Sequence, residues 1–362
     1  MLSETKHLNS APKQSRMVRA ILITILLLFA GILLTGADSA EAALCETPGA
    51  HGQCTAPLPP PTFSTPPPRA GSILDGVTYG WIEDYARFYE RPDLESRRTH
   101  YASTGVFYGP VDDTATGSDG EEWLKVWDHW LPAEKYHRVE ASTFSGVRIN
   151  AQPQRPFGWV LHPFQPRPEP GAQAEPDTPE LPRYEFVEVY GTQVGSDGAM
   201  WHDIGGGQWI RYHAVALQMV RERPRGVDEH EYWVDVDLWQ QTLAAYEGDR
   251  IVFASIISSG LPRWPTRHGL FRVYARHLTT PMSGGEVGDD YYRLADVPHT
   301  LYYDKAIALH GAYWHDDFGR PKSHGCVNIP PRAAEWLYFW SENAPGDLRV
   351  WVHSSTYADF LY

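Results

Sequence analysis

The stretch that decides the fold reads Ser323-His324-Gly325-Cys326-Val327-Asn328, and a shorter motif, His310-Gly311, precedes it. Cys326 is the only cysteine outside the N-terminal region. A thiol is a useful nucleophile only as a thiolate, which requires a nearby base or a positive electrostatic field. His324 is two residues before this cysteine and His310 is sixteen residues before it. Sequence adjacency alone therefore leaves both histidines open as the base.

The residues around the cysteine predict its local structure. Gly325 has no Cβ, so a substrate carbonyl could approach the backbone N–H groups of this turn. Residues 330–337 read as the start of a helix, because Pro331 is near the first helical position. Cys326 is therefore expected on a turn between a strand and a helix.

Three interpretations of the cluster compete. In the first, Cys326 is a buried structural cysteine beside incidental histidines. In the second, His310, His315, His324 and Cys326 bind zinc, but zinc needs three or four convergent ligands and the spacing His-x-Cys is not that of a zinc finger. We favour the third, in which Cys326 is the nucleophile of an acyl-transfer enzyme that uses neither a metal nor a cofactor.

These motifs resemble those of the L,D-transpeptidase (YkuD-type) family of bacterial cell-wall enzymes. The family motif is His-Gly, a variable loop, and then Ser/Thr-His-Gly-Cys-hydrophobic-Asn/Arg, and every fixed position is filled here. The resemblance extends from Glu231 to His353, where the strand pattern is regular and a hairpin turn is expected at Gly248-Asp249. Arg267 stands where the family has proline, a departure that affects a loop and not the chemistry.

The resemblance implies a role for each motif residue. Cys326 would be the nucleophile, and His310, oriented by the backbone carbonyl of Gly311, would accept and donate the proton. Ser323 and His324 would shape the nucleophile turn. The N–H groups of Gly325 and Cys326 would bind the oxyanion, and Asn328 would fix the turn through its amide. The side chains that would line the substrate cleft are Tyr313, Trp314, Met282 and Ser283. Met282 and Ser283 belong to a predicted loop at 280–285, and the two loop aromatics could equally be packing residues.

The implied reaction is peptidoglycan cross-linking. The thiolate would attack a tetrapeptide stem at the bond between its third residue, a diamino acid, and the terminal D-Ala, release D-Ala, and pass the acyl group to the side-chain amine of another stem. Hydrolysis of the same acyl-enzyme, which would make the protein an L,D-carboxypeptidase, uses the same residues and stays open. A non-catalytic cell-wall-binding protein is the third alternative, and the intact Cys326 and His310 argue against it.

Composition and the N-terminus indicate the setting. The chain has 362 residues with 31 basic and 45 acidic side chains, a balance of −14, and an acidic chain without a basic stripe argues against a nucleic-acid partner. Residues 1–42 combine a basic region, an apolar run and an Ala-x-Ala site, which predicts an export signal that is either cleaved or retained as a membrane anchor. The rest of the chain is therefore expected outside the cytoplasmic membrane, in the bacterial cell envelope, with the cell wall and its stem peptides as partners. Cys45 and Cys54 could pair there or stay free.

The fold is expected to be mainly β, with an L,D-transpeptidase-type β-sandwich catalytic domain at 229–354. Residues 43–70 are predicted to be a Pro-rich linker. The segments 71–160 and 183–228 contain short aromatic strand patterns that resemble bacterial SH3-like small β-barrels, and a Pro-rich loop or linker at 161–182 separates them. A weak internal echo pairs Trp127 and Trp130 with Trp201 and Trp209. These modules could bind wall peptide or act as spacers.

Overall fold

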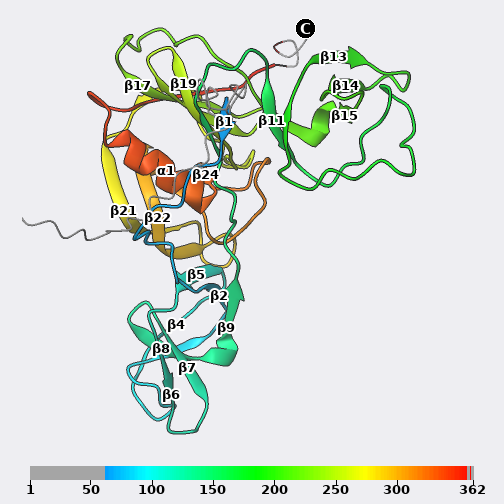
Figure 1. The fold of residues 1–362 in the computed structure, drawn as a ribbon. Coiled ribbons are helices and arrows are strands. Elements are labelled where there is room, and N and C mark those ends of the chain that lie inside the picture. Colours follow the sequence, from blue (N-terminus) through cyan, green and yellow to red (C-terminus); the bar gives the residue numbers. More distant parts are fainter. Residues whose placement is uncertain (1–61, 357–358, 360–362) are drawn as a thin grey trace, which may run out of the picture. The chain divides into compact units, whose positions relative to one another are not determined.

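The computed structural model describes residues 62–356 and Asp359, which all lie within the compact unit Pro60–Tyr362. The predicted export segment, Cys45, Cys54 and the linker before residue 62 lie outside the described residues. No helix in the described part of the chain is long and apolar enough to cross a membrane. Strands predominate in the fold, as expected (Figure 1).

The first sheet of the catalytic region has seven strands in the order β1-β10-β19-β18-β17-β25-β20. The predicted turn at Gly248-Asp249 joins two of its central strands, and Gly248 has a φ of 58°, which glycine adopts without steric cost. The central strands are buried on both faces because the second sheet and the helix cover one face and the second module covers the other. The catalytic-region strands of this sheet are β17 (Tyr232–Asp237), β18 (Thr242–Glu247), β19 (Arg250–Ile256), β20 (Gly269–Arg272) and β25 (Arg349–His353).

The second sheet of this region holds the His310-Gly311 motif, has Cys326 immediately before one of its strands, and packs against the helix. Its elements are β21 (Ala275–Gly284), β22 (Tyr292–Asp304), β23 (Ile307–Gly311), β24 (Val327–Ile329) and α1 (Pro331–Ser341). The helix begins at Pro331, as predicted, and its apolar side chains share one core with both sheets. Two expectations are corrected here. Cys326 precedes the short strand β24, because residues 327–329 pair with β23, and the predicted loop at 280–285 is largely strand, because it pairs with β22.

Residues 79–139 form the first module. Its elements are β2 (Tyr79–Ile82), β3 (Arg87–Tyr89), β4 (Arg98–Tyr101), β5 (Val106–Pro110), β6 (Asp113–Thr116), β7 (Glu122–Val126), β8 (His129–Pro132), the 3₁₀ helix η1 (Ala133–Lys135) and β9 (Tyr136–Val139). Strand β5 pairs antiparallel with β2 of its own module and parallel with β22 of the catalytic region. The second catalytic sheet therefore continues into the first module (Figure 1).

Residues 157–218 form the second module. Its elements are β11 (Phe157–Val160), β12 (Phe186–Glu188), β13 (Gly191–Val194), β14 (Met200–Asp203), β15 (Trp209–Arg211), η2 (Tyr212–Ala214) and β16 (Val215–Gln218). Strand β11 lies in the segment 71–160 predicted for the first module, but it pairs with β12 and β16 and so belongs to the second. The Pro-rich interval 161–182 is a loop of the second module and not a linker between modules, because Phe164 pairs with Leu181 and Arg167 pairs with Trp209.

The two modules repeat one arrangement. In each, the first strand pairs with a later strand of the module, β2 with β5 and β11 with β12, and also with the last strand, and a 3₁₀ helix precedes that last strand. The repeat includes a tight turn in which an aspartate accepts the indole N–H of a tryptophan, Asp119 from Trp123 at 3.3 Å and Asp197 from Trp201 at 3.1 Å. Trp201 therefore corresponds to Trp123 and not to Trp127, which corrects the register of the sequence echo.

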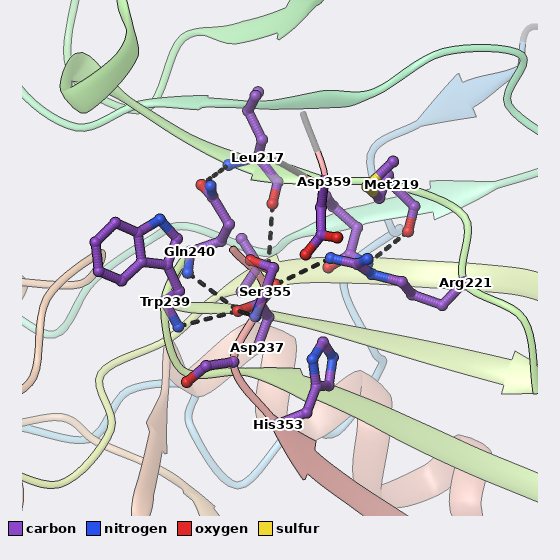
Figure 2. Close-up of polar contacts among 12 residues, drawn as sticks. Leu217, Met219, Arg221, Asp237, Trp239, Gln240, His353, Ser355 and Asp359 are labelled. Atoms are coloured by element: carbon purple, nitrogen blue, oxygen red, sulfur yellow. Dashed lines mark hydrogen bonds and ion pairs between the residues drawn. The ribbon is translucent and has the colours of Figure 1, made fainter. Parts of the chain in front are cut away.

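A buried polar network joins the end of the second module to strand β17 of the catalytic region (Figure 2). One carboxylate oxygen of Asp237 accepts backbone N–H groups of Trp239, Gln240 and Ser355 at 2.9, 3.2 and 3.1 Å, and the other pairs with Arg221 at 3.3 Å. The Gln240 side chain in turn accepts the Leu217 N–H. Both carboxylate oxygens of Asp237 therefore have partners, which compensates for the burial of its charge.

The described end of the predicted Pro-rich linker is attached to the catalytic region. Strand β1 (Phe63–Ser64) pairs with β10 (Val147–Ile149), which pairs with β19, so two segments outside the predicted catalytic domain extend its first sheet. The Arg69 guanidinium lies over the Phe339 ring of α1, 3.5 Å from its centroid. Residues 62–69 are therefore docked on the catalytic region.

Candidate active site

A short turn presents the candidate nucleophile. Cys326 immediately precedes β24. The buried Ser323 hydroxyl donates a hydrogen bond to the backbone carbonyl of Cys326 and accepts the N–H of Gly325 at 3.1 Å. Gly325 has a φ of 113°, which a residue with a Cβ rarely adopts, whereas the nearest atom to such a Cβ would be 3.4 Å away. The glycine is therefore required by its backbone conformation.

A second segment holds this turn from behind. Gly260 lies beside Ser323, and Leu261 donates its N–H to the Ser323 carbonyl at 2.9 Å. The hydroxyl of Thr266, only 3% exposed, accepts the Gly260 N–H at 2.9 Å and donates to the Gly325 carbonyl at 2.8 Å. A Cβ on Gly260 would lie 2.1 Å from a backbone oxygen and 2.9 Å from the Gly325 Cα. Backbone contact of this closeness fixes the position of the nucleophile turn.

Strand β23 carries the candidate base. His310 is 2% exposed, and its Nδ1–H donates to the carbonyl of Gly311 at 3.1 Å, the hydrogen bond that the family resemblance implies. Burial lowers the pKa of His310 to about 4, because an imidazolium would be poorly solvated there, and the Gly311 contact opposes this shift. The imidazole is therefore neutral at pH 7, with Nε2 as its available acceptor.

The thiol of Cys326 is held in its neutral form. Burial raises its pKa to about 11, and a hydrogen bond from the Ala308 backbone partly offsets this effect. The sulfur also contacts the Ala306 carbonyl at 3.8 Å. The thiol and the imidazole are therefore both uncharged at neutral pH.

Both groups open into one cavity of about 300 Å³. Its walls come from five segments of the chain, and most of its lining is apolar or aromatic. The lining residues are Val106, Tyr108, Met282, Tyr292, Leu294, His310, Trp314, His315, Lys322, Ser323, His324, Cys326 and Asn328. A largely apolar cavity with a few convergent polar groups suits the binding of a small substrate segment.

The structure separates the predicted cleft residues. Trp314 and Met282 line the cavity, whereas Ser283 is exposed and outside it, because alternate residues of β21 point to opposite faces. Tyr313 is fully buried, stacks on Tyr79 at 4.0 Å and donates its hydroxyl to the Ala295 carbonyl. Tyr313 is therefore a packing residue and does not line the substrate cleft.

Three predicted turn contacts also differ in detail. The side-chain amide of Asn328 lies 3.0 Å from His315 Nε2, so it ties β24 to the loop after β23 and not to the turn itself. The His324 ring packs at a tilt against Trp264, with ring centroids 4.0 Å apart, and its Nε2 lies 3.5 Å from an Asp290 carboxylate oxygen. The Gly325 N–H is already bonded to Ser323, which leaves the Cys326 N–H as the remaining backbone donor proposed for the oxyanion.

Several cavity residues were not predicted. Val106 and Tyr108 come from the first module, and no local sequence signal connects that strand to the catalytic motifs. Tyr292 and Leu294 lie opposite them on β22. Thr266 could have been found from the resemblance, because it opens the segment Thr266-Arg267-His268-Gly269 that follows the family pattern.

The alternative of a metal centre finds no matching geometry. Among the described residues, no group of three or more His, Cys, Asp or Glu side chains is arranged to hold a metal ion. Nδ1 of His315, a member of the proposed ligand set, accepts the Asp317 N–H at 3.1 Å. Cys326 is a free thiol in the described part of the chain.

A cysteine and a histidine thus line one cavity beside the second catalytic sheet. The family model for the YkuD family, the L,D-transpeptidase catalytic domain, matches residues 231–352, which confirms the resemblance over this segment. No curated protein matches the chain.

Similar solved structures are those of L,D-transpeptidases. That of Stackebrandtia nassauensis is 22% identical, with 36% of this chain and 58% of that chain covered and a TM-score of 0.28. Residues 123-326 of the Xylanimonas cellulosilytica DSM 15894 protein are 26% identical, with 36% and 64% covered and a TM-score of 0.27. The catalytic domain from E. faecium is 23% identical, with 34% and 98% covered and a TM-score of 0.30. The match thus spans about three fifths of the first two chains.

Proposed function

We propose that the chain is a peptidoglycan L,D-transpeptidase that works through a cysteine acyl-enzyme. The observation that carries the proposal is that Cys326 and His310 line one cavity while the Gly311 carbonyl holds the His310 ring at Nδ1. This hydrogen bond fixes the tautomer in which Nε2 accepts a proton. The family match over residues 231–352 supports the reaction class.

The first half-reaction follows from this arrangement. The Cys326 sulfur attacks the carbonyl of the third stem residue while its proton moves to His310 Nε2. The tetrahedral intermediate then collapses, the bond to the D-Ala nitrogen breaks, and His310 returns the proton to that leaving amine. The products are a thioester on Cys326 and free D-Ala. The Cys326 N–H is the backbone donor that we assign to the developing oxyanion.

A defined tetrapeptide muropeptide incubated with the purified protein tests the proposal. Mass spectrometry is expected to show the mass of the protein plus the acyl tripeptide, release of D-Ala, and cross-linked dimers. The Cys326→Ala variant is expected to fold and to give none of these. Release of D-Ala by that variant at the wild-type rate would refute the mechanism, and tripeptide without dimers would identify a carboxypeptidase.

We also propose where the protein works and what its modules are. The basic and apolar pattern of residues 1–42 supports export beyond the cytoplasmic membrane, and protease accessibility on spheroplasts tests it. The repeated arrangement of strands and 3₁₀ helix supports two SH3-like barrels. The pairing of β5 with β22 supports a structural role for the first of them, as opposed to a spacer that swings freely.

A further inference from the structure

The first module supplies part of the catalytic cavity wall. Strand β5 runs parallel to β22, with Val106 opposite Tyr292 and Tyr108 opposite Leu294. Alternate residues of a strand point to the same face of the sheet, so these four side chains lie together. All four line the cavity that holds Cys326. The catalytic cavity is therefore incomplete without the first module.

A second cavity of about 550 Å³ lies on the first module, and we call it the module cavity. It shares Val106 and Tyr108 with the catalytic cavity, so one pair of side chains forms the wall between the two. Val106 is 49% exposed, which is high for a valine in a strand that is paired on both sides. A peptide that occupies the module cavity would therefore reach the acyl-enzyme along β5.

The chemistry of the module cavity favours a cation. Glu83 and Asp84 are its acidic lining residues, and the lining has no lysine or arginine. Hydrogen bonds from His137 and Lys135 lower the pKa of Glu83, so it is a carboxylate at neutral pH. Asp84 accepts the Gly105 N–H at 3.2 Å and pairs with no cation among the described residues. Its carboxylate is free to bind one.

The module cavity also offers an aromatic surface. The Trp81 side chain is 38% exposed and stacks on His137 at a ring distance of 4.1 Å. An exposed indole beside a free carboxylate suits a ligand that combines an ammonium group with an apolar chain.

We propose that the module cavity binds the acceptor, a peptide that carries a side chain with a primary amine. This inference rests on the proposed function and adds the location of its second substrate. The bound ammonium group first releases one proton to solvent, and the neutral amine nitrogen then attacks the thioester carbonyl, the carbon–sulfur bond breaks and an amide bond forms. One amine proton passes through His310 Nε2 to the Cys326 sulfur, which restores the free thiol and the neutral imidazole.

The test separates the two half-reactions in the full-length protein. The tetrapeptide muropeptide is the donor, and a tripeptide stem with a free side-chain amine is the acceptor. Acyl-enzyme formation is followed by intact mass, and dimer formation is followed as a function of acceptor concentration. Asp84→Asn keeps the hydrogen bond to Gly105 but removes the charge, and Trp81→Ala removes the aromatic surface.

Matched controls come from the second module. Asp203→Asn alters an aspartate that likewise accepts a glycine N–H, and Tyr190→Ala removes an exposed aromatic ring, and neither residue lines the two cavities. We expect Asp84→Asn and Trp81→Ala to raise the acceptor KM about tenfold, the factor for about 1.4 kcal/mol, with acyl-enzyme formation unchanged. The controls are expected to match the wild type.

Salt supplies a second readout. Added salt is expected to raise the acceptor KM of the wild type and to have less effect on Asp84→Asn, since exposed charges are screened. An unchanged acceptor KM in Asp84→Asn overturns the inference, and so does an equal loss of both half-reactions. Absence of any acyl-enzyme on wild-type Cys326 would instead overturn the proposed function, and this outcome is visible before any acceptor is added.

Discussion

Replacement of Thr266 by valine tests whether the buried hydroxyl holds the nucleophile turn. The change keeps the shape of the side chain but removes the Oγ1 that joins the Gly260 N–H to the Gly325 carbonyl. Both backbone groups belong to buried residues, and an unsatisfied buried group costs about 1–3 kcal/mol, so we expect a loss of about 2–5 kcal/mol. The melting temperature should fall by on the order of 5 °C or more.

The same variant should lose activity. A nucleophile displaced by a fraction of an ångström leaves its attack geometry, and losses of about 10–100-fold in kcat are typical of such shifts. Thr266→Ser retains the hydroxyl and should restore most of both properties. Thr279→Val on the exposed face of β21 is the control for the loss of a hydroxyl. If Thr266→Val melts and turns over like the wild type, the bridge does not hold the turn.

Three further predictions concern protonation and packing. Because burial raises the pKa of Cys326 to about 11, the rate of iodoacetamide labelling should rise about tenfold per pH unit from pH 7 to 10, and His310→Ala should keep this slope. An inflection of the labelling rate near pH 6–7 would instead indicate a thiolate–imidazolium pair. Three fully buried histidines, His202, His299 and His310, have pKa values lowered to about 4. The unfolded chain therefore binds protons first as pH falls from 6.5 towards 4, and denaturant titration should show about 2 kcal/mol of stability lost per histidine by pH 5. Constant stability over this pH range would refute their neutral burial. Gly158→Ala places a Cβ 1.9 Å from the Ala216 carbonyl oxygen and should destabilise the second module. In the control Gly191→Ala the new Cβ meets no atom within 4 Å, so this variant should keep the wild-type stability. Equal melting curves for the two variants would contradict this packing.

The sequence by itself determined the elements with strong local signals. The alternating pattern after Glu231, the hairpin turn at Gly248-Asp249 and the helix start at Pro331 were predicted where the structure has them. The motif residues Cys326 and His310 were also predicted to share a site, and they line one cavity. In each case the information is contained in a few consecutive residues, or in two motifs of a resembled family.

Only the tertiary structure decided what depends on the choice of strand partner. The segment that carries Met282 reads as a loop from its Thr, Pro and Gly content, yet pairing with β22 makes it a strand. Residues 157–160 belong to the second module because β11 pairs with β16, and Tyr108 reaches the catalytic cavity because β5 pairs with β22. Backbone hydrogen bonds between distant strands form with little regard to the local sequence, since every residue except proline offers the same donor and acceptor. The active-site motif could therefore be predicted from the sequence, whereas the completed cavity required the structure.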